Sequence, residues 1–95
     1  MLSDIYIAQR RQLIEAKGEV TREGIRMAIG QLFDYKRFAP PGTRLAVLLP
    51  WHPGPDLEAL LATVEVSCIW PRDEAEFVDN AIGVFVLGAP KTPAS

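Results

Sequence analysis

The sequence predicts an α/β domain built on a mixed sheet that is flanked by helices. Three observations predict this class. Short apolar segments of strand length recur along the chain, the first two lie close enough to form a hairpin, and segments of helical periodicity separate the later ones. The predicted order is hairpin, helix, strand, helix, strand. Ninety-five residues suffice for one such domain, at residues 1–88, followed by a disordered tail at residues 89–95.

The predicted hairpin pairs residues 4–8 with residues 12–17. Strand side chains alternate between the two faces of a sheet, so Glu15 and Lys17 share one face of the second strand. A carboxylate and an ammonium at the end of an otherwise apolar strand cost desolvation energy unless they hold something. A divalent metal ion and a phosphate are suitable ligands for such a pair.

The register of this hairpin decides whether a second carboxylate joins the pair. If the turn centres on Arg10 and Arg11, Asp4 faces Lys17 and lies diagonal to Glu15 on the same face, about 5–8 Å away. The two carboxylates could then share one cation. A slip of one residue would move Asp4 to the other face of the sheet.

A helix is predicted to follow the hairpin. Gly18 ends the second strand, Thr21 is the expected N-cap, and Pro40 stops the helix. Gly30 lies inside the helix, where glycine is unfavourable, and therefore predicts a close contact at that position.

The helix has two neighbouring stripes along one side. At 3.6 residues per turn, the buried stripe contains Ile25, Ile29 and Leu32. The second stripe consists of Gly24, Ala28, Gln31 and Tyr35. This places Gln31 and Tyr35 one turn apart, along the seam between the helix and the sheet.

The remaining segments alternate between strand and helix. Residues 44–49 form a near-continuous apolar run, as in a strand that is covered on both faces. The expected elements after it are a helix at residues 56–64, a strand at residues 65–70, a short edge strand at residues 77–78 and a last strand at residues 82–87. We interpret Trp51 and Trp70 as packing anchors, Cys68 as a small buried hydrophobe and His52 as a surface loop residue.

Composition places the chain among globular proteins of a reducing compartment. Apolar residues make up 48% of the sequence and charged residues 23%, and a single cysteine cannot form an internal disulfide. No apolar segment reaches the length of a membrane span, and the N-terminus lacks the residue order of a secretory signal. We therefore expect a cytoplasmic protein without a membrane partner.

Charge is distributed unevenly along the chain. The net charge of −2 by itself argues against a nucleic-acid binder. Up to Arg44 there are eight Lys or Arg residues and five Asp or Glu residues, a local charge of +3. From Leu45 onward the counts are two and seven, a local charge of −5. A basic working face on an acidic body would produce this asymmetry, and so would a chance fluctuation in a short chain.

An ordered set of residues resembles a known superfamily. The set is Asp4, then Glu15-Ala16-Lys17, then a helix with Gln31-x-x-x-Tyr35. It resembles the PD-(D/E)XK nucleases, which have the restriction-endonuclease-like fold, and the Gln-x-x-x-Tyr helix resembles their RecB-type branch. The resemblance covers roughly residues 3–80. It implies a restriction-endonuclease-like mixed sheet and hydrolysis of DNA phosphodiester bonds, in restriction, defence or repair.

The resemblance also implies a role for each matching residue. Asp4 and Glu15 would coordinate one Mg²⁺ or Mn²⁺ ion, and Lys17 would orient or deprotonate the attacking water. Gln31 and Tyr35 would brace the site or touch the DNA backbone. The implied phosphate contacts are Arg10, Arg11, Arg22 and Arg26. The donor chemistry agrees with this, because carboxylates suit a hard cation and the sequence has no Cys/His cluster for zinc.

The sequence also departs from the pattern of the superfamily. Ser3 precedes Asp4 where a proline is usual. The superfamily core normally begins with a helix and a strand that this sequence does not show. We expect an N-terminally truncated core; the alternative is that a second copy or a partner chain completes the sheet.

Other interpretations of these residues stay open. Glu15 and Lys17 could form a solvated charge pair, Asp4 could be a strand-start acid with no role, and Gln31 with Tyr35 could serve helix packing. The main alternative function is a non-catalytic nuclease-like module for protein contact or DNA docking. A phosphate-binding α/β domain with no nuclease descent is a weaker third.

Overall fold

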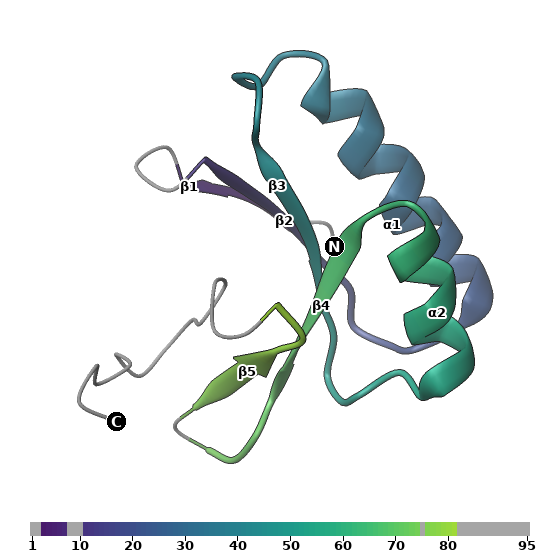
Figure 1. Cartoon of the computed structure of the whole chain (residues 1–95). Coiled ribbons are helices and arrows are strands. Elements are labelled where there is room, and N and C mark those ends of the chain that lie inside the picture. Colours follow the sequence, from purple (N-terminus) through teal and green to yellow (C-terminus); the bar gives the residue numbers. More distant parts are fainter. Residues whose placement is uncertain (1–2, 8–10, 75, 82–95) are drawn as a thin grey trace.

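The computed structural model describes the backbone of residues 3–7 and all atoms of residues 11–74 and 76–81 (Figure 1). The predicted strand at residues 82–87 and the predicted tail at residues 89–95 lie outside the described residues. The elements are β1 (Ser3–Ile7), β2 (Gln12–Ala16), α1 (Arg22–Lys36), β3 (Arg44–Leu48), α2 (Pro55–Thr63), β4 (Val66–Pro71) and β5 (Phe77–Asp79).

The strands form one mixed sheet in the order β1-β2-β3-β4-β5. The outer pairs β1–β2 and β4–β5 are antiparallel, whereas β2, β3 and β4 run parallel to one another. The predicted α/β class and the order from hairpin to β4 are therefore confirmed. Both parallel connections step in the same direction across the sheet, and such crossovers are right-handed, so α1 and α2 lie on the same face (Figure 1).

The core lies mainly between the sheet and the two helices. Leu13, Leu45 and Val47 of the strands pack there against the buried side of α1. The predicted stripe is confirmed at Ile25 and Leu32, which are fully buried, and Ile29 packs partly buried against the same cluster. Ala28 of the second stripe is also fully buried, so the helix rests on the line between the two stripes.

A smaller apolar cluster covers the other face of the sheet. It consists of Ile14, Ala46 and Ile69, which are all fully buried, with Leu48, Phe77 and Ala81 packed against them. Strand β3 therefore contributes side chains to both clusters. This confirms the prediction, made from its continuous apolar run, that both of its faces are covered.

The hairpin has a different register from the predicted one. Asp4 pairs with Glu15 and Tyr6 with Leu13, so each partner is shifted by two residues, and the expected turn centre at Arg10 and Arg11 is wrong. The last pair joins Ile7 to Gln12, which leaves a connection of residues 8–11 that ends on Arg11 at a φ of 53°. A shift of two preserves the alternation of faces, so the positions of Asp4 and Glu15 still belong to the same face.

The helix ends follow local rules. Thr21 is the N-cap of α1, as predicted, and its Oγ1 accepts a hydrogen bond of 2.9 Å from the Gly24 N–H. Helix α2 starts at Pro55 after Gly54, which has a φ of 91° that favours glycine. Neither described helix is long and apolar enough to cross a membrane.

The two glycines inside α1 have different surroundings. A Cβ at Gly24 would lie 2.9 Å from Thr21 Oγ1, so the absence of a side chain there leaves room for the cap. A Cβ at Gly30 would meet nothing within 4 Å. The prediction of a close contact at Gly30 is therefore wrong, because this position faces open space and not the sheet.

These surroundings predict opposite effects for one substitution. Gly30→Ala should raise the free energy of unfolding by up to about 1 kcal/mol, because alanine loses less backbone entropy in a helix. Gly24→Ala should raise the free energy of unfolding less than Gly30→Ala does, or lower it, because the new methyl group presses on the capping hydroxyl of Thr21. Urea denaturation of both variants measures the difference, and equal gains in the two would contradict this account of the cap.

Candidate functional site

Glu15 and Lys17 form an ion pair at the carboxyl end of β2. Lys17 Nζ lies 3.7 Å from Glu15 Oε2, so the two side chains share a face as the strand alternation predicts. The Glu15 side chain is 0% exposed and that of Lys17 is 19% exposed. A carboxylate removed from water in this way needs a compensating partner, and the Lys17 ammonium supplies positive charge to it.

A cavity of about 490 Å³ adjoins Lys17. It lies between the end of β2 and the first turns of α1, where Gly18, Gly24 and Met27 line it together with Lys17 and Glu19. Lys17 therefore stands between solvent and the buried Glu15 carboxylate. The Lys17 N–H continues the parallel pairing by donating to the Leu48 carbonyl at 3.0 Å, which holds the backbone at this point.

The backbone of Asp4 lies next to that of Glu15. Asp4 is the register partner of Glu15 across the β1–β2 hairpin, so their backbones are adjacent. The pairing of Cα positions brings Asp4, Glu15 and Lys17 to the same end of the sheet.

Gln31 and Tyr35 lie further along α1. The helix runs back from the carboxyl end of β2, so Gln31 is ~6 Å and Tyr35 ~12 Å beyond Met27 along its axis. Gln31 Oε1 is buried and has no hydrogen-bond partner within the described part of the chain, and Tyr35 is 39% exposed. Among the described residues, α1 reaches the cavity beside Lys17 with Gly24 and Met27 and not with the Gln-x-x-x-Tyr pair.

The four predicted phosphate contacts have different surroundings. Arg22 forms an ion pair with Asp56 and so connects the start of α1 to the start of α2. Arg26 is exposed on α1. Arg11 donates a hydrogen bond of 3.4 Å to the Pro41 carbonyl, and Arg10 lies outside the described residues.

A polar cluster that the sequence did not predict connects the carboxyl ends of β3 and β4. Glu58 of α2 accepts hydrogen bonds from His52 Nε2 at 2.9 Å and from the Asn80 amide at 2.8 Å. His52 Nδ1 accepts from the Gly54 N–H at 2.9 Å, so the proton of the neutral ring lies on Nε2. Asn80 Oδ1 accepts from the Cys68 N–H at 3.0 Å.

This cluster is a structural clamp. Both carboxylate oxygens of Glu58 and both ring nitrogens of His52 are occupied, and the His52 ring packs edge to face on Trp70 with centroids 4.6 Å apart. His52 is thus more than a surface loop residue. Glu58 and Asn80 are 22 residues apart, and no local pattern signals a contact of that range.

The surroundings of two groups in this region shift their pKa values. The amide of Asn80 lowers the pKa of Glu58 below the ordinary 4.5, with help from the hydrogen bond and charge of His52 and against the effect of burial. Burial raises the pKa of the Cys68 thiol to about 12, with smaller effects of Glu58 and Asp79. Cys68 is therefore a neutral, buried residue, as predicted.

The two tryptophans, both predicted as packing anchors, differ in burial. Trp70 packs against the main core and is confirmed as an anchor, whereas Trp51 is 59% exposed, so its prediction as an anchor is wrong. Trp51 lies in the loop between β3 and α2. Within the residues that the structure describes, no three His, Cys, Asp or Glu side chains are grouped so that they could hold a metal ion.

Comparisons of this chain with protein-family models, with curated proteins and with solved structures found no match. The assignment of a function therefore depends on the geometry described above and on the resemblance in the order of residues.

The lowered pKa of Glu58 predicts a pH dependence of stability. A carboxyl whose pKa is lower in the folded state stabilises the fold above its unfolded value, and this stabilisation is lost as the pH falls through the folded pKa. The free energy of unfolding should therefore fall below about pH 4.5, and it should fall less steeply in Glu58→Gln. Urea denaturation between about pH 6 and about pH 3 measures both slopes.

The matched control for this prediction is Glu74→Gln, which changes an exposed carboxylate outside the clamp in the same way. If Glu74→Gln flattened the acid slope as much as Glu58→Gln does, the effect would come from net charge and not from the clamp.

Proposed function

We propose that this chain is the core of a divalent-metal-dependent nuclease that hydrolyses phosphodiester bonds of DNA, in restriction, defence or repair. The observation that supports this best is the meeting of Asp4 and Glu15 as register partners, with the Lys17 ammonium 3.7 Å from the Glu15 carboxylate. Two carboxylates and a lysine at one point are what metal-assisted attack on a phosphate needs.

The order of the elements also supports a restriction-endonuclease-like fold. An antiparallel pair carries the acid on its first strand and the Glu-x-Lys pair on its second. Helix α1 then crosses over to β3, which runs parallel to β2. This is the order in which the residues of the resemblance occur, although the likeness in topology is shared by other α/β folds.

The donor set fits a hard divalent cation. Asp4 and Glu15 would hold Mg²⁺ or Mn²⁺ through carboxylate oxygens, and these metals prefer such ligands. When bound, the metal would polarise the scissile phosphate and lower the pKa of a bound water.

The protein's own residues have separate tasks in this proposal. Lys17 lies at the border between the cavity and the buried Glu15, where its ammonium can orient a water and offset negative charge that develops on the phosphate. Gln31 and Tyr35 brace α1 against the sheet. Of the four arginines predicted to contact phosphates, Arg26 and Arg11 would contact the DNA backbone, Arg11 from the amino end of β2, whereas the pairing of Arg22 with Asp56 suits a role in helix packing.

One observation favours the second candidate, a non-catalytic nuclease-like module for protein contact or DNA docking. The Glu15 side chain is 0% exposed, and a metal ligand must be reached by the ion. In that case Glu15 and Lys17 would be a remnant of a nuclease site that no longer binds metal. Strand β1, which is the outermost strand on one side of the sheet formed by the described residues, would then pair with a second copy or a partner chain.

Cleavage of plasmid DNA with Mg²⁺ separates the candidates. The nuclease proposal expects cleavage that EDTA abolishes and that falls about a hundredfold or more in Lys17→Ala, because the charge that stabilises the transition state is removed. Arg72→Ala is the control, since Arg72 pairs with Glu76 in a loop away from Lys17. Undiminished cleavage by purified Lys17→Ala would reject the role of Lys17.

Calorimetric titration with Mn²⁺ tests the metal site directly. The wild type should bind one ion and Glu15→Gln should lose that affinity while keeping its thermal unfolding transition. A wild type that is folded and binds no Mn²⁺ would reject the nuclease proposal and favour the non-catalytic module.

A further inference from the structure

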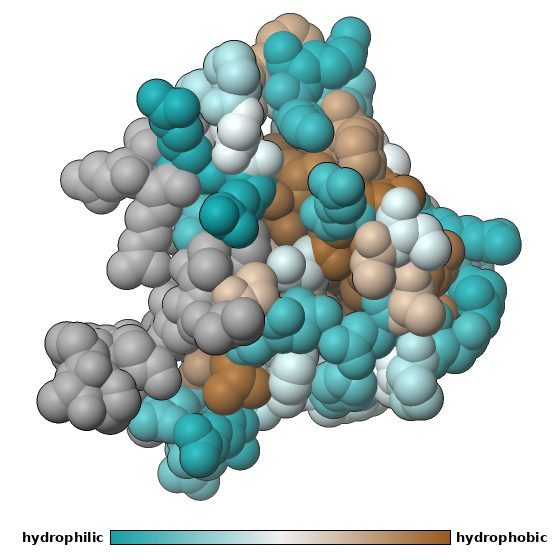
Figure 2. All heavy atoms as spheres, in the orientation of Figure 1, coloured by the Kyte–Doolittle hydropathy of each residue, from teal (hydrophilic) through white to brown (hydrophobic). Residues whose placement is uncertain are grey.

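A second cavity lies at the opposite end of the sheet from Lys17. It has a volume of about 600 Å³ and is bordered by the amino ends of β3 and β4 and by the carboxyl ends of both helices. Figure 2 shows apolar surface between these strand ends and the helices, surrounded by hydrophilic side chains. The volume is in the range of sites that bind small organic ligands.

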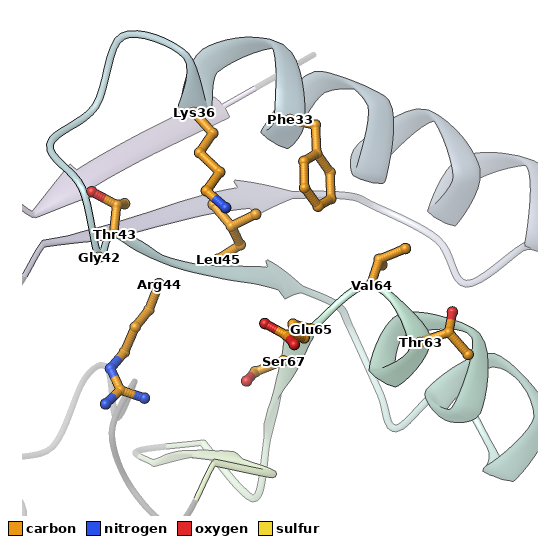
Figure 3. A pocket seen from close by; sticks show the side chains of 10 residues that line it. All are labelled: Phe33, Lys36, Gly42, Thr43, Arg44, Leu45, Thr63, Val64, Glu65 and Ser67. Atoms are coloured by element: carbon orange, nitrogen blue, oxygen red, sulfur yellow. The ribbon is translucent and has the colours of Figure 1, made fainter.

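One part of the cavity wall is apolar and partly aromatic. In Figure 3, Phe33 and Lys36 extend from α1 toward the strands, with Leu45 and Val64 on the other side of the space between them. Leu45 is almost fully buried, whereas Phe33 is 38% exposed. Lys36 Nζ lies 5.4 Å from the centroid of the Phe33 ring, so the ring and a positive charge are presented together.

The charges around this cavity are not paired with each other. In the part of the chain that the structure describes, Lys17, Arg22, Arg37 and Arg72 each form an ion pair with a carboxylate. No such pair is made there by the cavity residues Lys36, Arg44 and Glu65. Arg44 extends from β3 in a different direction from Lys36, so positive charge borders two sides of the opening (Figure 3).

Glu65 is held in a conformation that glycine would adopt more easily. Its φ is 60°, and its N–H donates to the Ala62 carbonyl at 3.0 Å, as at many helix ends where glycine is preferred. Glu65 and Ser67 both line the cavity (Figure 3). Folding alone would favour glycine here, so the carboxylate is retained at a conformational cost.

Arg11 repeats this feature at the same end of the sheet. Its φ is 53°, and its carbonyl accepts a hydrogen bond of 2.8 Å from the Arg44 N–H. Among the described residues other than glycine, Arg11 and Glu65 are the two with positive φ. Both are charged, and they stand at the amino ends of β2 and β4, on either side of Arg44.

We propose that this cavity binds a nucleoside monophosphate group, either as a free nucleotide or as one unit of a single-stranded nucleic acid. The phosphate contacts Lys36, the base stacks on Phe33, and the Glu65 carboxylate accepts hydrogen bonds from amino groups of the base or from a sugar hydroxyl. The carbonyl ends of α1 and α2 carry negative partial charge, so attraction for the phosphate must come from side chains. Lys36 supplies it by contact, and Arg44, which points to the other face of the sheet, supplies positive charge at the opening.

A simple inorganic anion would use only part of this site. It would fill a small fraction of the 600 Å³ and leave the apolar wall and the Glu65 carboxylate without contacts. The proposal does not depend on metal chemistry at Glu15 and Lys17, because the two cavities lie at opposite ends of the sheet.

Fluorescence anisotropy of a labelled six-nucleotide oligodeoxyadenylate, in EDTA at low salt, tests the proposal. Lys36→Met should weaken binding about tenfold and reduce the slope of log affinity against log salt by about 0.7, as expected for one phosphate contact in a single strand. Phe33→Leu should weaken binding about tenfold through lost stacking. Circular dichroism verifies that each variant is folded.

One control variant makes the result specific. Arg72→Met removes an exposed cation from the loop after β4, away from this cavity, and should leave the affinity unchanged. If Lys36→Met bound like the wild type, or if Arg72→Met lost as much affinity as Lys36→Met, the cavity would not be the site. Loss of oligonucleotide binding in Lys36→Met with unchanged Mg²⁺-dependent cleavage of plasmid DNA would support this proposal separately from the nuclease proposal.

Competition distinguishes the possible sources of the ligand. Adenosine monophosphate should displace the oligonucleotide far better than inorganic phosphate does; equal competition would overturn the proposal, because the base would then contribute nothing. If adenosine monophosphate displaces the oligonucleotide at concentrations close to the dissociation constant of the oligonucleotide, the natural ligand is a free nucleotide. If much higher concentrations are needed, the natural ligand is a single strand.

Glu65→Gly supplies a variant that keeps the fold. Glycine adopts the observed φ freely, so the thermal unfolding transition should be preserved. Binding of adenosine monophosphate should weaken several-fold because an acceptor for its amino and hydroxyl groups is lost. Unchanged affinity would remove Glu65 from the site and overturn its part in the proposal.

Discussion

The buried ion pair of Glu15 and Lys17 is the constraint on which the rest of this structure depends. Glu15 occupies the layer between the sheet and α1, where its neighbours across and along the strands are Val47 and Leu13. Moving a carboxylate out of water costs several kcal/mol, which a lysine offsets only in part. Two apolar residues in place of Glu15 and Lys17 would make the fold at least as stable. The nuclease proposal gives this pair a chemical role.

The path of the chain separates this pair from the second cavity. Two successive right-handed crossovers place both helices on one face and leave the two ends of the parallel strands open to different surroundings. The loop from β2 to α1 forms one end and contains Lys17. The helix-to-strand connections form the other, where Lys36, Arg44 and Glu65 gather. Each end thus has its own set of charges, taken from segments distant in sequence.

The clamp around Glu58 stabilises the loop between β3 and α2. His52 and Asn80 approach the same carboxylate from two different connections, and Asn80 also binds the backbone of β4. Because the hydrogen bonds cross between segments, this region is expected to move as one unit with the sheet. The carboxyl end of the parallel strands is consequently held from both sides, at Lys17 by backbone pairing with Leu48 and at His52 by side chains.

The sequence by itself determined the strands and helices as far as β5, the Thr21 cap, and the shared face of Glu15 and Lys17. These depend on periodicity and on contacts within a few residues. Only the tertiary structure decided that Asp4 pairs with Glu15, that Gly30 faces open space, that Trp51 is exposed, and that Glu58 joins His52 to Asn80. Periodicity tells which side of an element a residue lies on; the length of loops and the direction of crossovers choose its partner.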